Sequence, residues 1–142
     1  MVPGDTWLEM DVDILIPAAL GQQISRSTVE KISEQVKIIA EGAIGPTTPW
    51  ADQLLDPRGI HIIPDLLASA GGVICSYYEH VQSMNNYFWE KSDVLGQLDV
   101  KMTSAYYDVS DFAKEHDIKM RDAAIVMAVD RVANACRLRG WV

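Results

Sequence analysis

VKIIAEGAIGPTTPWADQLLDPRGIHIIPD, residues 36–65, is the stretch that decides the fold. Two apolar runs rich in β-branched residues open and close it, at 36–40 and 60–63. Short runs of this kind, bounded by turn-forming residues, predict buried strands of a parallel sheet. The stretch therefore predicts two neighbouring strands and a connection between them.

The connection carries the signals of a helix. Thr48 can cap its start, and Pro49 suits the first helical position because that position has no helical partner for an N–H. Pro57 and Gly59 then end the helix. Strand, helix and strand in this order predict parallel strands joined by a right-handed crossover.

Another strand and helix are predicted upstream. Residues 12–16 form a third apolar run, and residues 24–36, ISRSTVEKISEQV, separate it from the next strand. Ser25 or Ser27 can cap a short surface helix in this segment. Its partial apolar stripe consists of Ile24, Val29 and Ile32. The alternation of strands and helices predicts an open α/β sheet.

From residue 66 onward the pattern is helical. Gly71 and Gly72 mark a kink or a close approach near the start of the first helix. Its apolar residues at helical spacing are Val73, Tyr77, Val81, Met84 and Phe88. A second helix has a seam of Leu95, Leu98, Met102, Ala105, Val109, Phe112 and Ala113. A third, within 120–141, has a seam of Ile125, Ala128, Val129, Val132, Ala133 and Cys136.

The strands and helices are out of balance. Three strands make only half of a doubly wound sheet, yet three apolar-faced helices follow with no further strands to cover. A partner domain or a partner chain is the simplest supplier of the missing surface.

Composition narrows the class of protein. The 142 residues suit one globular domain with one core, and the formal net charge of -8 disfavours nucleic acid and anionic membranes as partners. The start, MVPGDTWLEMD, has no basic-then-apolar pattern, and no run of 18 apolar residues occurs, so we expect a cytoplasmic protein. Cys75 and Cys136 have no metal-like spacing with the histidines, and we expect reduced, buried thiols.

Candidate ligand contacts follow the predicted strand ends. Ligands of open parallel sheets bind beyond the carboxyl ends of the strands, which here means residues 17–19, 41–45 and 64–65. Small residues there would let a planar ligand approach the backbone, although the same residues also suit tight turns. Helices starting near Thr48 and Gly71 would point free N–H groups to that edge. The sequence has neither GxGxxG nor a P-loop, so a nucleotide site would lack its pyrophosphate cradle.

Four ordered motifs carry a resemblance to a known family. They are DVDILIPAAL at 11–20, AEGAIGPTTPWAD at 40–52, IIPDLLASAGGVICSYYE at 62–79 and RLRGWV at 137–142. Together they resemble the C-terminal portion of a glutamate dehydrogenase, and they favour the glutamate branch over the leucine, valine and phenylalanine branches.

The resemblance implies a fold and a reaction. It implies the second half of a Rossmann-like dinucleotide-binding domain over residues 1–88, and hinge and C-terminal helices that return to the substrate domain over 89–142. The family's reaction is the oxidative deamination of glutamate to 2-oxoglutarate with NAD or NADP. The family also implies an oligomer, in which this chain would need an N-terminal dehydrogenase domain or a full-length dehydrogenase subunit as its partner.

The resemblance also implies roles for single residues. Ala18 and Ala19 match the pair beside the nicotinamide ribose. Gly42 belongs to the motif at 40–52, which also lies on the cofactor side. Ser76 matches the serine that holds the distal carboxylate of the substrate, and Val73 lines the same pocket. A serine hydroxyl suits that task because it donates to a carboxylate without adding charge; the other interpretation of Ser76 is a solvated or back-bonding helix serine.

Two positions depart from the family. Ile44 and Ser69 stand where the family has asparagines beside the nicotinamide and the substrate. Isoleucine offers no hydrogen bond, whereas Ser69 can keep part of the role through a water or a shorter direct bond. The motif at 40–52 therefore keeps its turn-forming residues but loses its most polar position.

The family's lysines and aspartate for proton transfer lie in its N-terminal domain, so we expect this chain to be inactive alone. The local acid/base candidates are Asp65, Glu79, His80 and Asp122, each with a structural alternative: a helix cap for Asp65, a helix face for the next two and a first helical turn for Asp122. A non-catalytic subunit that binds a complete dehydrogenase is the competing hypothesis. A split enzyme and a gene relic are further alternatives.

Overall fold

The structure, a computed structural model, describes residues 4–141. They form two compact units that divide between Ser69 and Ala70. The expectation of a single core is therefore wrong, because the helices that follow the sheet pack among themselves.

The first unit contains a three-stranded parallel sheet of β1 (Ile14–Leu15), β2 (Ile38–Ala40) and β3 (His61–Ile63). The strands lie in the order β1-β2-β3, and Ile39 pairs with both Leu15 and Ile62 across the sheet. The three strands fall within the three predicted apolar runs and are shorter than them. The predicted α/β class with about three parallel strands is confirmed.

The connection from β2 to β3 also follows the prediction. Helix α1 (Pro49–Leu55) begins after Thr48, whose hydroxyl accepts a hydrogen bond from the Ala51 N–H at 3.4 Å. A 3-10 turn, η3 (Asp56–Arg58), then ends at Gly59, where φ is +67°. This left-handed conformation favours glycine, so Gly59 stops the helix for a clear steric reason.

The connection from β1 to β2 differs from the prediction of a surface helix. Over 24–36 the chain makes turns and a single 3-10 segment, η2 (Val29–Lys31). Neighbouring hydroxyls compete for the backbone here: Thr28 Oγ1 donates to the Gln23 carbonyl at 2.7 Å and accepts from the Ser25 N–H at 2.8 Å. The apolar stripe is buried rather than superficial, because Ile24 is 0% and Val29 2% exposed.

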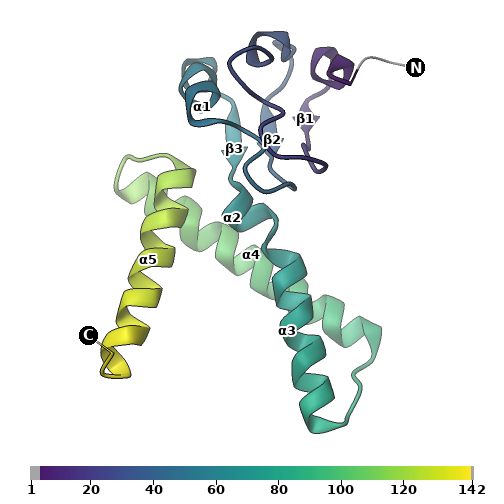
Figure 1. The fold of residues 1–142 in the computed structure, drawn as a ribbon, viewed down its shortest axis with the longest axis vertical. Helices are drawn as coiled ribbons and strands as arrows, with labels where there is room; N and C mark the ends of the chain where they lie inside the picture. The colour runs from purple at the N-terminus through teal and green to yellow at the C-terminus, as the bar shows by residue number, and fades with distance from the viewer. Residues whose placement is uncertain (1–3, 142) are drawn as a thin grey trace. The chain divides into compact units, whose positions relative to one another are not determined.

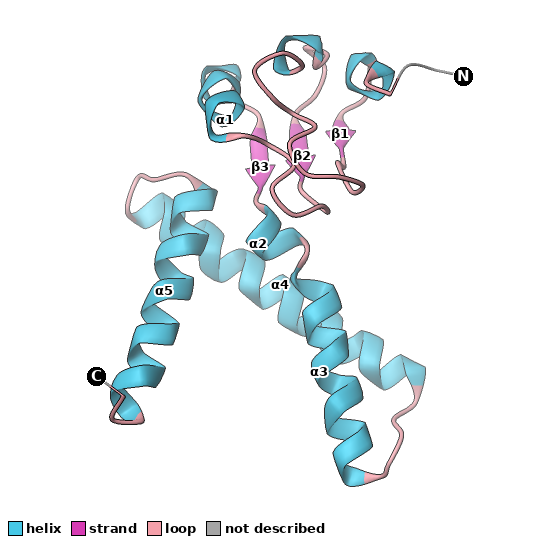
Figure 2. Cartoon of the chain, in the orientation of Figure 1, coloured by secondary structure: helices cyan, strands magenta, loops and turns pink. Residues whose placement is uncertain are grey.

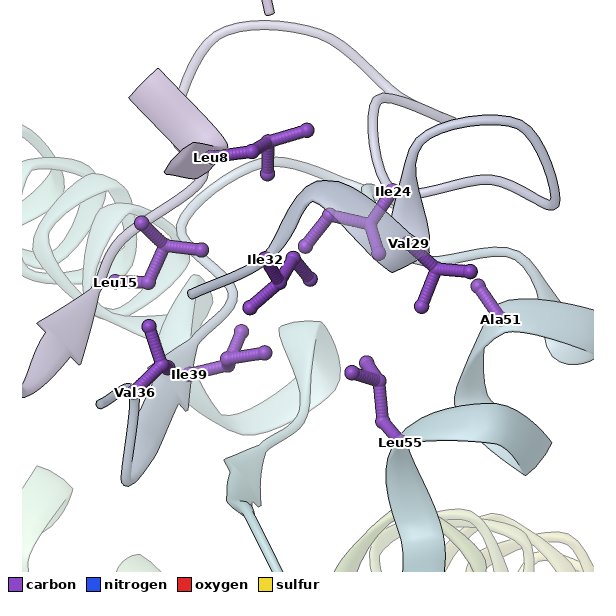
Figure 3. Close-up of a cluster of buried hydrophobic side chains, with 9 residues drawn as sticks. All are labelled: Leu8, Leu15, Ile24, Val29, Ile32, Val36, Ile39, Ala51 and Leu55. Atoms are coloured by element: carbon purple, nitrogen blue, oxygen red, sulfur yellow. The ribbon is translucent and has the colours of Figure 1, made fainter. Parts of the chain in front are cut away.

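The core of the first unit lies on one face of the sheet (Figure 3). Its buried residues are Leu8, Leu15, Ile24, Val29, Ile32, Val36, Ile39, Ala51 and Leu55. Leu8 comes from the short 3-10 segment η1 (Thr6–Glu9). Side chains alternate along an extended chain, and the residues on either side of Leu15 in the sequence, Ile14 and Ile16, are 53% and 61% exposed. Among residues 4–141, the side chains on the other face at this point are therefore left exposed.

A surface ion pair joins the starts of β1 and β2. Lys37 Nζ donates to Asp13 Oδ1 at 2.6 Å, and this ammonium lowers the pKa of the Asp13 carboxyl below its ordinary value. Both side chains are largely exposed, so the pair contributes little to stability.

The second unit consists of three helices, as predicted: α3 (Ala70–Asn85), α4 (Lys91–Glu115) and α5 (Met120–Leu138). Helix α4 packs against both α3 and α5 (Figure 1). No described helix has an apolar stretch long enough to cross a membrane. Cys75 and Cys136 are free and only partly buried, which corrects the expectation of buried thiols.

The predicted seams of the three helices are only partly buried. Val109 and Ala113 of α4 are buried, as expected. Most of the seam residues predicted for the first and third helices are exposed: Val73, Tyr77, Met84, Phe88, Ile125, Val129 and Val132. Phe88 lies beyond the end of α3. On α5, Ala123 and Ala124 are buried instead. The exposed seams agree with the expectation that this chain does not supply what covers them.

Tyr78 is the large buried side chain of α3. The centre of its ring lies 5.6 Å from that of the Trp89 ring, and the backbone N–H of Trp89 donates to Gln82 Oε1 at 2.7 Å. The Tyr78 hydroxyl is buried and has no hydrogen-bond partner among residues 4–141. A buried polar group left unpaired costs free energy.

Replacing Tyr78 with Phe should therefore stabilise the chain. We expect Tyr78→Phe to raise the free energy of unfolding by about 1 kcal/mol, since it removes the unpaired hydroxyl and keeps the ring. Tyr77, 62% exposed on the same helix, supplies the control Tyr77→Phe, for which no change is expected. Urea denaturation followed by circular dichroism measures both, and a loss of stability in Tyr78→Phe would contradict the assignment.

Candidate functional site at the carboxyl edge of the sheet

The three segments that follow the strands meet at one edge of the sheet (Figure 2). The Ala43 N–H donates to the Pro17 carbonyl at 2.8 Å, which joins the end of β1 to the loop after β2. The Gly45 N–H donates to Asp65 Oδ2 at 2.8 Å, which joins that loop to the end of β3. The structure therefore brings together the three predicted strand ends.

Glu41, in the predicted segment 41–45, is a buried carboxylate whose burial and structural role sequence reasoning did not predict. It is 0% exposed, and its Oε2 accepts a hydrogen bond from the Asp65 N–H at 2.9 Å. A carboxylate is costly to bury unless it is hydrogen-bonded. Its place directly after a buried strand was the available signal, since a charged residue there needs a partner close by.

Gly42 is needed for packing between strand ends. A Cβ built on it would lie 3.1 Å from Ala18 Cβ and 3.7 Å from Ile16 Cγ2. Any larger residue at position 42 would press on the end of β1. The space beside Gly42 is thus filled by Ala18, and the close approach of these two segments is the reason for a glycine here.

Ala18, Ala19 and Ile44 present small or apolar side chains at the edge. The two alanines are exposed, and Ile44 is 83% exposed. Gly21 packs closely beneath the loop, since a Cβ there would lie 3.0 Å from the Ile44 carbonyl oxygen. The backbone around position 44 is therefore tightly packed, whereas its side chain faces solvent.

Ser69 closes the single turn of α2 (Asp65–Ala68). Its hydroxyl donates to the Asp65 carbonyl at 2.6 Å. This bond uses the only donor of the side chain and leaves it acceptor capacity. Ser69 thus differs from an asparagine, which would offer a donor and an acceptor to a ligand together.

Val73 and Ser76 belong to the second unit. They lie three residues apart on α3, share a helix face, and are both exposed. The candidate residues therefore form two groups: Ala18, Ala19, Gly42, Ile44 and Ser69 in the first unit, and Val73 and Ser76 in the second.

The local acid/base candidates have mainly structural settings. Asp65 does not cap α2 as predicted, because Pro64 occupies the N-cap position; the Asp65 carboxylate instead accepts from the Gly45 and Leu66 N–H groups. Glu79 and His80 are exposed on α3, and Asp122 lies in the first turn of α5, as predicted.

Metal ligands and open helix starts are two further features that a ligand site at this edge could offer. Within residues 4–141, no group of three or more His, Cys, Asp or Glu side chains could hold a metal ion. Helix α1 has an N–H engaged by Thr48, and α3 begins at Ala70, near the start predicted at Gly71. The expectation of two helix starts open to a ligand is therefore only partly met.

Comparison with known proteins identifies the family. The model of the Glutamate/Leucine/Phenylalanine/Valine dehydrogenase family matches residues 1–140. The chain belongs to this family. A glutamate dehydrogenase of Thermotoga maritima is 45% identical over 139 residues, and an NAD-specific glutamate dehydrogenase of Clostridioides difficile is 41% identical over 131 residues. These matches cover 98% and 92% of the chain but only 33% and 31% of the relatives.

Solved structures agree with this match. Glutamate dehydrogenase from Peptoniphilus asaccharolyticus aligns with a TM-score of 0.80 and 37% identity, over 89% of this chain and 32% of that protein. The hetero-hexameric glutamate dehydrogenase from Thermus thermophilus, in its Leu-bound form, aligns with a TM-score of 0.89 and 26% identity, over 95% and 32%. The chain thus spans about a third of its relatives and matches their C-terminal region.

The packing at Gly42 can be tested by substitution. We expect Gly42→Ala to lower the free energy of unfolding by about 1 kcal/mol, because the new methyl crowds Ala18. Adding Ala18→Gly should recover much of the loss. Gly72→Ala is the control: nothing lies within 4 Å of a Cβ there, and alanine favours a helix. If Gly42→Ala were as well tolerated as Gly72→Ala in urea denaturation, the packing role would be wrong.

Proposed function

We propose that this chain is the C-terminal part of a glutamate dehydrogenase and supplies part of its nicotinamide and substrate pocket. The reaction of the whole enzyme is the oxidative deamination of L-glutamate to 2-oxoglutarate with NAD or NADP. The observation that carries the proposal is the meeting of three strand ends at one edge, with Ala18 and Ala19 exposed on it. In open parallel sheets this edge is where ligands bind.

The edge fits one part of a nicotinamide better than another. Exposed alanines and a closely packed backbone suit the flat face of a ring. Ile44 gives the ring only apolar contact, and Ser69 has its one donor engaged by Asp65. The carboxamide of the cofactor would therefore find fewer hydrogen bonds here than two asparagines would provide.

Substrate contact is assigned to α3. Ser76 would donate to the distal carboxylate of glutamate, and Val73, one turn earlier on the same face, would line the pocket. Both side chains are exposed in this chain, as a contact to a ligand or to another protein requires. This proposal also divides the chain by role. Residues 1–88 supply the cofactor side, and residues 89–142 supply the hinge and the helices that return to the substrate domain.

The proton-transfer groups must come from elsewhere. The Asp65 carboxylate holds backbone N–H groups, and the chain spans only a third of the relatives it matches. We therefore assign proton transfer and binding of the cofactor's phosphates to a part of a dehydrogenase outside these residues. That part would form an oligomer with this chain.

A second candidate function is a non-catalytic subunit that binds a complete dehydrogenase and modulates it. Two observations favour it: the apolar, 83% exposed Ile44, and the Ser69 donor turned back to its own helix. A part of an active enzyme gains nothing from losing amides at these positions. In a subunit of this kind, the edge of the sheet would line the pocket but would not bind the cofactor tightly.

The purified chain should not oxidise glutamate. We expect no NAD⁺- or NADP⁺-dependent turnover by absorbance at the reduced cofactor's band, and only weak NADH binding by fluorescence titration. Adding the N-terminal two thirds of the Thermotoga maritima relative tests the pocket-part function, which predicts that turnover appears. Turnover by the chain alone would contradict both candidate functions. If the mixture stays inactive and the chain binds a whole dehydrogenase tightly, the result would favour the non-catalytic subunit.

Position 44 tests the cofactor contact. In a complex of this chain with that N-terminal part, Ile44→Asn should strengthen NADH binding several-fold, since one neutral hydrogen bond contributes about 0.5 to 1.5 kcal/mol. Leu54, which is 36% exposed on α1, supplies the control Leu54→Asn, for which affinity should not rise. An unchanged affinity in Ile44→Asn would place this residue outside the cofactor site.

A further inference from the structure

Asp65 and Glu41 form a linked pair of contacts around the loop that carries position 44. The Glu41 carboxylate, itself buried, accepts the Asp65 N–H at 2.9 Å, and the Asp65 carboxylate accepts the Gly45 N–H at 2.8 Å. The Asp65 side chain thus holds the end of the loop 42–45. The buried Glu41 carboxylate, which directly precedes this loop, in turn holds the backbone of Asp65.

Two other bonds hold the same loop to the end of β1. The Ala43 N–H donates to the Pro17 carbonyl at 2.8 Å, and the Gln22 N–H donates to the Gly45 carbonyl at 2.7 Å. Gly45 has φ +56°, a left-handed conformation that a glycine adopts without a side-chain penalty. Both sides of residue 44 are therefore fixed by hydrogen bonds, while its side chain is 83% exposed.

We infer that Asp65 is a positioning residue: with Glu41 behind it, it fixes the backbone of the loop 42–45 and so sets where the side chain at position 44 is presented. The Asp65 carboxylate is then a structural anion and not the acid or base of a reaction. The side chain at position 44 can therefore be substituted without moving the backbone of the loop. A role of this positioning in cofactor binding rests on the proposed function. The positioning of the loop by Asp65 is independent of it.

Amide hydrogen exchange of the full chain, followed by NMR, tests the positioning without any ligand. We expect Asp65→Ala to speed exchange of the Gly45 amide at least tenfold more than that of Ile39 in the core, because the acceptor is gone. Asp65→Asn keeps one acceptor oxygen at nearly the same volume and should give a smaller increase. If Asp65→Ala fails to fold, the comparison of Asp65→Asn with the native chain remains.

Asp11 supplies the control, since its carboxylate also accepts a hydrogen bond, but from Ser33 Oγ at 2.7 Å and not from the loop 42–45. Asp11→Ala should leave Gly45 exchange unchanged relative to Ile39. Equal acceleration of Gly45 and Ile39 in Asp65→Ala would overturn the inference, because it would show only a general loss of stability. The same would follow if Asp11→Ala accelerated Gly45 as strongly.

A binding arm separates this inference from the proposed function. In the complex with the N-terminal part of the relative, the gain in NADH affinity from Ile44→Asn should disappear when Asp65→Ala is added. If Gly45 loses protection while that gain persists, Asp65 does not control how position 44 meets the cofactor. If Ile44→Asn gives no gain at all while Gly45 still depends on Asp65, the positioning stands and the proposed cofactor contact fails.

Discussion

The parallel register of three very short strands is the constraint on which the site depends. Ile39 pairs with Leu15 on one side and Ile62 on the other, so the ends of β1, β2 and β3 reach one edge together. With two or three residues per strand, this ladder alone is small. The hydrogen bonds from Ala43 to Pro17 and from Gly45 to Asp65 extend it into the loops. They turn three separate strand ends into one surface.

Both units leave apolar surface exposed, and the chain matches only a third of the length of its relatives. Parallel sheets are normally buried on both faces, yet Ile14 on β1 and Ile16 just beyond it remain exposed. In the second unit the buried apolar residues are few, and exposed seam residues such as Val129 and Val132 line α5. Exposed apolar surface of this extent is typical of a protein that binds another protein. The proposed function assigns the cover of this surface to a part of a dehydrogenase outside these residues.

Local signals made the first unit largely predictable from sequence. Thr48, Pro49 and Gly59 act through their own backbone preferences, so the helix between β2 and β3 was predicted correctly. The segment 24–36 was not, because hydroxyl bonds such as that from Thr28 to Gln23 replace helical ones and its apolar residues turn inward from several directions. That outcome depends on tertiary packing, which periodicity does not reveal.

The candidate site was predictable in place but less so in detail. Strand topology indicated the edge and its small residues, but the burial of Glu41 and its bond to Asp65 depend on two strands lying side by side. Asp65 was expected to cap a helix and instead holds Gly45. Which seam residues are exposed could not be derived from periodicity, because it depends on how the three helices pack on one another.

Sedimentation velocity over a range of concentrations, with thermal unfolding of the same samples, tests the central claim most directly. If the apolar faces of the second unit belong against another protein, the purified chain will self-associate as its concentration rises or melt without a sharp transition. A single monomeric species at every concentration, unfolding in one cooperative step, would show that the chain is complete by itself and would contradict this account.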